Sequence, residues 1–121
     1  MNNLKRFTGA CIEAMYFADT GEEGQPASDA EIHAETLLDI KADCRSFWRR
    51  FGCYIVAIEN ERHHKDYVER AGHDFWLTRN GHGAGFWDGD WPKCYESLLT
   101  DGAKGYGPFE IYEDVRGRIC A

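Results

Sequence analysis

The sequence predicts an α+β fold in which a small antiparallel sheet, two hairpins with three to four strands, packs against three to four helices. Three observations predict it. Apolar residues recur at helical spacing, an Asn-Gly pair separates two aromatic runs within residues 73–88, and apolar and polar residues alternate near the C-terminus. A chain of 121 residues buries one core but is too short for two, so we expect residues 1–121 to form a single domain.

Two helices are expected in the first half of the chain. The first should span residues 4–19. The second should begin near Asp29, because Ser28 followed three residues later by Glu31 is typical of a capping box. Gly52 interrupts this long second helix. A continuous helix is favoured, and the alternatives are a kink, a break, or a short strand beginning in residues 52–59.

Two shorter helices are expected further along. One should span residues 62–71 and end at Gly72, since glycine readily adopts the left-handed conformation that ends many helices. The other should begin at residues 90–92, Asp-Trp-Pro, and end near Gly105 or Gly107.

Residues 73–88, HDFWLTRNGHGAGFWD, are the most distinctive segment and predict a tight aromatic β-hairpin. Its strands should be residues 75–79 and 84–88. Residues 80–83 should connect them, because Asn-Gly supplies the positive φ angles that a primed turn needs. A shorter hairpin is expected over residues 109–120.

The net charge of −7 is unevenly distributed. Residues 19–43 carry eight acids against one base, whereas residues 45–70 carry six bases against four acids. This balance argues against direct nucleic-acid binding, which needs a positive surface for phosphates. An acidic face can instead meet a basic groove on another protein; a solvated surface and a mimic of nucleic acid are the alternatives. The residues of this predicted acidic face are Glu31, Glu35, Asp39 and Asp43.

The sequence indicates a cytoplasmic protein without membrane contact. No apolar run reaches the length of a membrane span, and the first residues lack the apolar stretch of a signal peptide. Five cysteines without a C-x-x-C pair indicate free, buried thiols. His63 and His64 would point about 100° apart on a helix and so cannot share a metal. We expect neither a metal nor a cofactor.

The polar residues of segment 73–88 are candidate ligand-binding groups. His82 beside an acid such as Asp74 could act as a general base, and Arg79 could hold an anion. The segment has no serine or cysteine nucleophile. The alternative is that His82 is a turn residue, Asp74 a cap or cross-strand partner, and the aromatic rings form the core.

Other residues near this segment are candidates for interaction. Trp76 and Trp87 offer aromatic surface of the kind found at interface hot spots, and a homodimer is a further alternative. The carboxylates of Asp88 and Asp90 could bind a divalent ion or act in acid–base chemistry, but capping of the following helix explains them with fewer assumptions.

Residues 71–88, AGHDFWLTRNGHGAGFWD, resemble a family of small uncharacterised bacteriophage and prophage proteins. The other stretches that resemble it are ETL at 35–37, ADCRSF at 42–47, LL at 98–99, AKGYG at 103–107 and IYED at 111–114. The resemblance implies a phage origin and expression in the cytoplasm of a bacterial host.

From these features we expect a phage-type accessory protein that acts stoichiometrically by binding a host protein, for example as an inhibitor of a bacterial defence system. The acidic face and the aromatic segment are its expected contact surfaces. The alternative is a small-ligand, nucleotide-like binding protein or an enzyme, in which Asp74, Arg79 and His82 converge on a pocket at residues 75–88. No motif dictates a reaction, so binding is favoured over catalysis.

Overall fold

The computed structural model describes residues 2–63 and 65–121 and is predominantly helical. Its elements, in chain order, are α1 (Asn3–Asp19), α2 (Ala34–Arg62), α3 (Tyr67–Arg79), α4 (Lys93–Lys104), β1 (Tyr112–Glu113) and β2 (Ile119–Cys120). The two strands form an antiparallel sheet. The predicted α+β fold with three to four strands is therefore wrong, because segment 73–88 is helical in its first half and forms a loop in its second.

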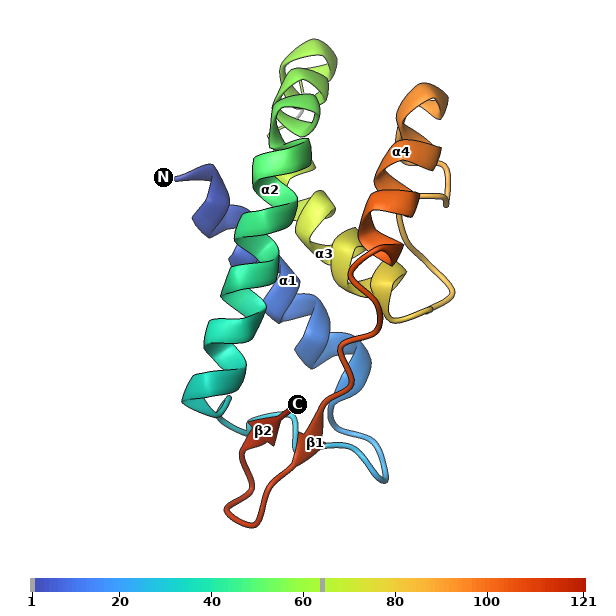
Figure 1. Ribbon diagram of the computed structural model, residues 1–121. Helices are drawn as coiled ribbons and strands as arrows, with labels where there is room; N and C mark the ends of the chain where they lie inside the picture. Colours follow the sequence, from blue (N-terminus) through green and yellow to red (C-terminus); the bar gives the residue numbers. More distant parts are fainter. Residues whose placement is uncertain (1, 64) are drawn as a thin grey trace.

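Helices α1, α2 and α3 form the centre of the fold. In Figure 1, α1 crosses behind the long α2, α3 runs between α2 and α4, and the sheet lies at the opposite end from α4. The contact between α1 and α3 is the most extensive one between any two of these elements. Leu99 and Ala103 of α4 are fully buried, so α4 also contributes to the core.

Phenylalanine rings from distant parts of the chain meet in the core. Phe47 of α2 stacks on Phe75 of α3 with ring centroids 4.5 Å apart. Phe7 of α1 lies 5.6 Å from Phe47, and Phe86 of the loop after α3 lies 5.9 Å from it. All four are fully buried, and burial of each contributes about 1.5–3 kcal/mol. The aromatic runs thus supply the helical core instead of the surface of a hairpin.

Helix α2 continues through Gly52, which excludes a break or the start of a strand there. The indole ring of Trp48 lies against this glycine, and a Cβ added there would sit 2.6 Å from a ring carbon. Phe51 and Ile55 remain buried on either side of Gly52 in sequence. The helix therefore keeps its apolar face, and Gly52 makes room for a ring.

The start of α2 predicted at Asp29 is wrong. The backbone amide of Ile119 donates to the carbonyl oxygen of Glu31 over 2.7 Å. The amide of His33 donates to the carbonyl oxygen of Ile119 over 2.9 Å. These backbone groups bond to β2 and are not free to form a helical turn. The helix begins instead at Ala34, where His33 is the N-cap and its Nδ1 accepts from the amide of Glu35.

The helix end predicted at Gly72 is also wrong, since α3 continues through it to Arg79. Here α1 and α3 cross so closely that a Cβ on Gly72 would collide with the carbonyl oxygen of Phe7 and lie 2.8 Å from the Cβ of Ala10. The missing side chain therefore permits a helix crossing and does not mark a cap.

The predicted β-hairpin of residues 73–88 is replaced by the end of a helix. Gly81 has a φ of +71°, its amide donates to the carbonyl oxygen of Thr78 over 3.2 Å, and the amide of His82 donates to that of Leu77 over 3.0 Å. This pair of bonds is a Schellman motif, which needs a residue with positive φ, most often a glycine. Of the Asn-Gly pair, only Gly81 has the expected positive φ, since Asn80 has a φ of −94°, and the pair ends α3 and connects no strands.

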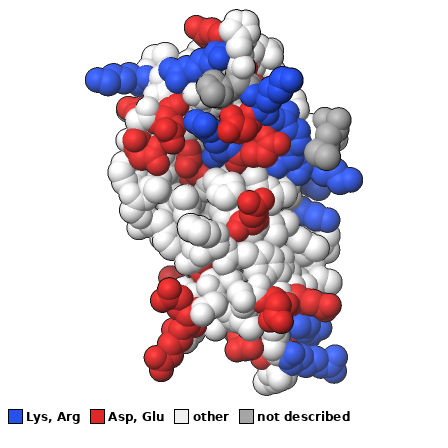
Figure 2. Space-filling view, turned by 180° about the vertical axis from the view of Figure 1, so that it is seen from behind, with Lys and Arg blue, Asp and Glu red and all other residues white. Residues whose placement is uncertain are grey.

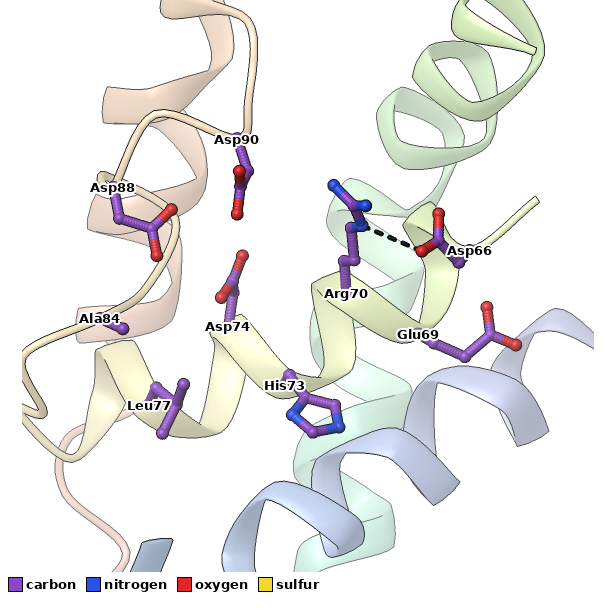
Figure 3. Close-up of a pocket in the computed structure, with 9 residues that line it drawn as sticks. All are labelled: Asp66, Glu69, Arg70, His73, Asp74, Leu77, Ala84, Asp88 and Asp90. Carbon is purple, nitrogen blue, oxygen red and sulfur yellow. Dashed lines mark hydrogen bonds and ion pairs between the residues drawn. The ribbon is translucent and has the colours of Figure 1, made fainter. Parts of the chain in front are cut away.

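The loop between α3 and α4 folds back over α3. The amide of Phe86 donates to Oγ1 of Thr78 over 3.1 Å. Gly85 lies so close to this hydroxyl that a Cβ on it would collide with Oγ1. The loop thereby carries Asp88 and Asp90 to the side of α3 on which Asp74 lies (Figure 3).

Three other sequence predictions are confirmed. Helix α1 matches the predicted residues 4–19 within one residue, and α4 ends next to Gly105, its C-cap. The C-terminal hairpin exists in a shorter form, with Tyr112 opposite Cys120 and Glu113 opposite Ile119.

The cysteines are all free, but they are not all buried as predicted. Cys11 and Cys44 are buried, Cys120 is half-buried, and Cys53 and Cys94 are exposed. Among the described residues, no helix is both long and apolar enough to cross a membrane.

Candidate functional site

The three polar residues expected to converge on one pocket lie in three different environments. Asp74 lines a cleft between α3 and the following loop, Arg79 is buried in the core, and His82 lines a second pocket near the end of α1. They separate because Asp74 and Arg79 belong to a helix, where they project in different directions, while His82 lies beyond its end.

Arg79 is a structural residue. Its Nη1 is 2.9 Å from Oδ2 of Asp43, its Nε donates to the carbonyl oxygen of Gly107 over 2.8 Å, and its Nη2 donates to that of Tyr106. The guanidinium also lies 5.2 Å from the centroid of the Phe75 ring. Its charge and donors are engaged inside the fold, so it is not free to hold an anionic ligand.

His82 pairs with an acid from a distant part of the chain. Its Nε2 lies 3.1 Å from Oδ2 of Asp19, at the end of α1, and the same oxygen accepts from Nε1 of Trp76 over 2.6 Å. Trp76 is 1% exposed, so this ring belongs to the core and is no surface anchor. His82 and Asp19 line a pocket of about 290 Å³ together with Glu110 and Phe109.

A larger cleft of about 400 Å³ lies beside α3. Its lining residues are Asp66, Glu69, Arg70, His73, Asp74, Leu77, Ala84, Asp88 and Asp90. Figure 3 shows the carboxyl groups of Asp74, Asp88 and Asp90 directed into the same space, Asp74 from α3 and the other two from the loop. We call this feature the acidic cleft.

Asp74 is the buried carboxylate of the acidic cleft. It is 8% exposed, and its Oδ2 accepts from Nε1 of Trp91 over 2.6 Å. In the part of the chain that the structure describes, no group donates to its Oδ1. Burial raises the pKa of Asp74 from 3.8 to about 6; the Trp91 hydrogen bond opposes this shift, and the charges of Asp88 and Asp90 add to it.

The cation of the acidic cleft is already engaged. Arg70 Nε lies 3.1 Å from Oδ2 of Asp66, one helical turn earlier, as the dashed line in Figure 3 marks. His73, the other basic group of the lining, lies 3.6 Å from Oε1 of Glu13. The carboxylates of Asp74, Asp88 and Asp90 therefore face one another with no ion pair to a described cation.

The position of Asp88 and Asp90 differs from the capping role expected for them. The N-cap of α4 is Pro92, and no side chain caps this helix. Oδ2 of Asp88 accepts from the amide of Gly85 over 3.3 Å, within the loop itself. The sequence offered Asp88 and Asp90 as a pair of carboxylates for a divalent ion, but it did not place them in a cleft with Asp74. The available signal was an Asp-Gly-Asp sequence beside a tryptophan whose indole needs an acceptor.

The remaining predicted contact residues differ in exposure. Trp87 is 46% exposed and follows the buried Phe86. On the predicted acidic face, Glu31, Glu35 and Asp39 are exposed, whereas Asp43 is half-buried in its ion pair with Arg79. Figure 2 shows acidic and basic side chains gathered towards the two ends of the molecule, with a largely uncharged belt between them.

The chemistry of the acidic cleft is that of binding a cation. Its described lining contains no serine, threonine or cysteine to act as a nucleophile. In residues 2–63 and 65–121, no three histidine, cysteine or acidic side chains are arranged to hold a metal ion; His64 lies outside this range. Converging carboxylates beside aliphatic Leu77 and Ala84 suit an organic cation such as an ammonium or a guanidinium.

Comparison of the chain with protein-family models, with curated proteins and with solved structures gives no match. The resemblance of residues 71–88 to a bacteriophage family therefore stays a prediction.

Proposed function

We propose that this protein acts by stoichiometric binding of a partner protein, and that its acidic cleft receives a lysine or arginine side chain of that partner. The observation that carries the proposal is the convergence of Asp74, Asp88 and Asp90 on one cleft without an ion-paired cation. A basic side chain would supply the missing counter-charge and donate to Oδ1 of Asp74.

The surroundings of the acidic cleft support a protein ligand. Leu77 and Ala84 line it, and they can cover the aliphatic part of a long basic side chain. Trp87, next in sequence to Asp88, keeps nearly half of its surface exposed, and partly exposed tryptophans are typical anchors of protein interfaces. The net charge of −7 would also accelerate encounter with a basic surface.

The resemblance to phage proteins suggests the class of partner. If the chain is a phage accessory protein, the partner is a bacterial host protein with an exposed arginine or lysine, for example a component of a defence system that the chain inhibits. Nucleic-acid-binding proteins of the host expose many such residues, which fits an acidic ligand.

The test uses affinity capture from bacterial lysate with three folded baits: wild type, Asp88→Asn with Asp90→Asn, and Glu22→Gln with Glu23→Gln. Both double variants remove two exposed acids, but Glu22 and Glu23 lie in the loop after α1, away from the acidic cleft. We expect wild type and the Glu22/Glu23 variant to recover one protein in a one-to-one ratio, and the Asp88/Asp90 variant to lose it. Failure of folded wild type to recover a partner, or equal recovery by all three baits, contradicts the proposal.

A second candidate function rests on the pair of His82 and Asp19. A histidine oriented by a carboxylate in a pocket of about 290 Å³ favours a small polar ligand. Asp19 and Glu110 both line this pocket, so a neutral nucleoside-like molecule fits better than a phosphorylated one. A thermal-shift screen with neutral nucleosides tests this candidate, because a specific ligand raises the melting temperature of wild type and leaves a His82→Ala variant unchanged.

A further inference from the structure

A third pocket differs from the other two in the sign of its charge. It has a volume of about 220 Å³, and its lining residues belong to the N-terminal end of α1 and to α2. Its lining residues are Asn2, Leu4, Lys5, Thr8, Lys41 and Arg45. Three of these six carry positive charge and none is acidic, although the whole chain has a net charge of −7.

The cations of this pocket have no acidic partners. Within the described chain, neither Lys5 nor Lys41 nor Arg45 forms an ion pair. Arg6 and Arg79 differ from these cations, since Arg6 pairs with Glu59 and Glu69 and Arg79 pairs with Asp43. An anion from outside is therefore the counter-charge that this pocket lacks.

The spacing of the cations on α2 adds to this argument. Lys41 and Arg45 are four residues apart and lie on one face of the helix, where two like charges destabilise it slightly. Lys5 adds a third positive charge from the neighbouring helix. The arrangement costs stability in the free protein, and a bound anion would reverse this cost.

The other lining residues supply hydrogen-bond donors and an apolar wall. Oδ1 of Asn2 accepts from the amide of Leu4 over 2.8 Å, which leaves the Nδ2 amide of Asn2 as a donor. Thr8 adds a hydroxyl group, and the side chain of Leu4 supplies the apolar wall. The positive end of the α1 dipole lies at the same place.

From these residues we infer that the pocket binds the phosphate group of a small phosphorylated molecule. Lys5, Lys41 and Arg45 provide charge and donors for the phosphate oxygens, and Leu4 contacts the organic part. A long polyanion does not fit, because the net charge of −7 repels it beyond this small basic pocket. The inference is independent of the acidic cleft, with which the pocket shares no lining residue.

The test is isothermal titration of the full chain at constant ionic strength with inorganic phosphate, adenosine 5′-monophosphate, adenosine and duplex DNA. We expect saturable one-to-one binding of the monophosphate and none of adenosine. The variant Lys41→Gln with Arg45→Gln should bind the monophosphate about tenfold more weakly or worse, because the charged hydrogen bonds from these two side chains to the phosphate are lost. The matched control, Lys93→Gln with Lys104→Gln, removes two exposed cations of α4 and should bind within about twofold of wild type.

Each probe distinguishes one source of the anion. Binding of the monophosphate that exceeds binding of inorganic phosphate supports a phosphate ester, and equal binding supports a site for the phosphate group alone. Absence of saturable binding to both overturns the inference. So does binding of duplex DNA alone, or equal weakening by the two double variants, because either result reflects the general field of the protein and not this pocket.

Discussion

Arg79 and Asp74 lie five residues apart on α3 and are buried to nearly the same degree, 6% and 8% exposed, yet the fold treats their charges differently. Arg79 makes an ion pair with Asp43 and two hydrogen bonds to carbonyl groups. Asp74 receives one hydrogen bond, from Trp91, and faces two further carboxylates. The charge of Arg79 is therefore part of the structure, whereas that of Asp74 destabilises the free protein and is available to a ligand.

The largest effect should come from removing the buried guanidinium. Arg79→Met keeps the apolar stem but leaves Asp43 and two carbonyl groups without their donor, so we expect a loss of about 3 kcal/mol in the free energy of unfolding. Urea denaturation measures it. The matched control on the same helix is Arg70→Met, which breaks an exposed ion pair and should cost less than about 1 kcal/mol. Equal losses in the two variants would mean that the buried ion pair of Arg79 stabilises the fold no more than the exposed pair of Arg70.

The next effect concerns pH. Between pH 3.8 and about 6 the folded protein keeps a proton on Asp74 that the unfolded chain has lost, so the stability contributed by this group falls as pH rises through that window. Relative to Asp74→Asn, wild type should lose up to about 3 kcal/mol of unfolding free energy between pH 4 and pH 7. The asparagine can still accept from Trp91 through Oδ1, so the variant should be the more stable protein at pH 7. Parallel pH profiles of the two proteins would contradict this.

A smaller effect tests the loop that brings Asp88 to the acidic cleft. A methyl group on Gly85 would collide with Oγ1 of Thr78, so Gly85→Ala should cost about 1–3 kcal/mol. Gly83→Ala is the control two residues earlier, since a Cβ there meets no atom within 4 Å and its effect should stay within about 0.5 kcal/mol. Chemical denaturation of both variants measures the difference. If Gly83→Ala is the more damaging, the loop does not rest on α3 through Thr78.

The smallest effect is expected from Asp88→Asn with Asp90→Asn. Both side chains are exposed, so the free energy of unfolding should change by less than about 0.5 kcal/mol. Their charges raise the pKa of Asp74, so its value should fall in the double variant. NMR titration of the Asp74 carboxyl carbon checks this shift. An unchanged pKa would mean that the three carboxylates do not share one cleft.

The amino-acid sequence carries the local signals of the fold. Apolar spacing predicted α1 and α4 with nearly correct ends, and the positive φ of Gly81 followed from the Asn-Gly pair. It did not determine whether that glycine turns a hairpin or ends a helix, because both conformations need the same residue. The aromatic residues on either side of this glycine are also compatible with both a hairpin and a helix end.

The roles of the glycines and of the charges depend on how the helices pack against one another. Gly72 permits a helix crossing because the carbonyl oxygen of Phe7 lies against it, and no pattern within α3 reveals this neighbour. The same holds for the charges: Asp43 neutralises Arg79, Asp19 binds His82, and Asp74 is left beside two more carboxylates. Each of these relations joins residues from separate elements of the fold, and the packing of those elements determines which charge is neutralised and which faces a cleft.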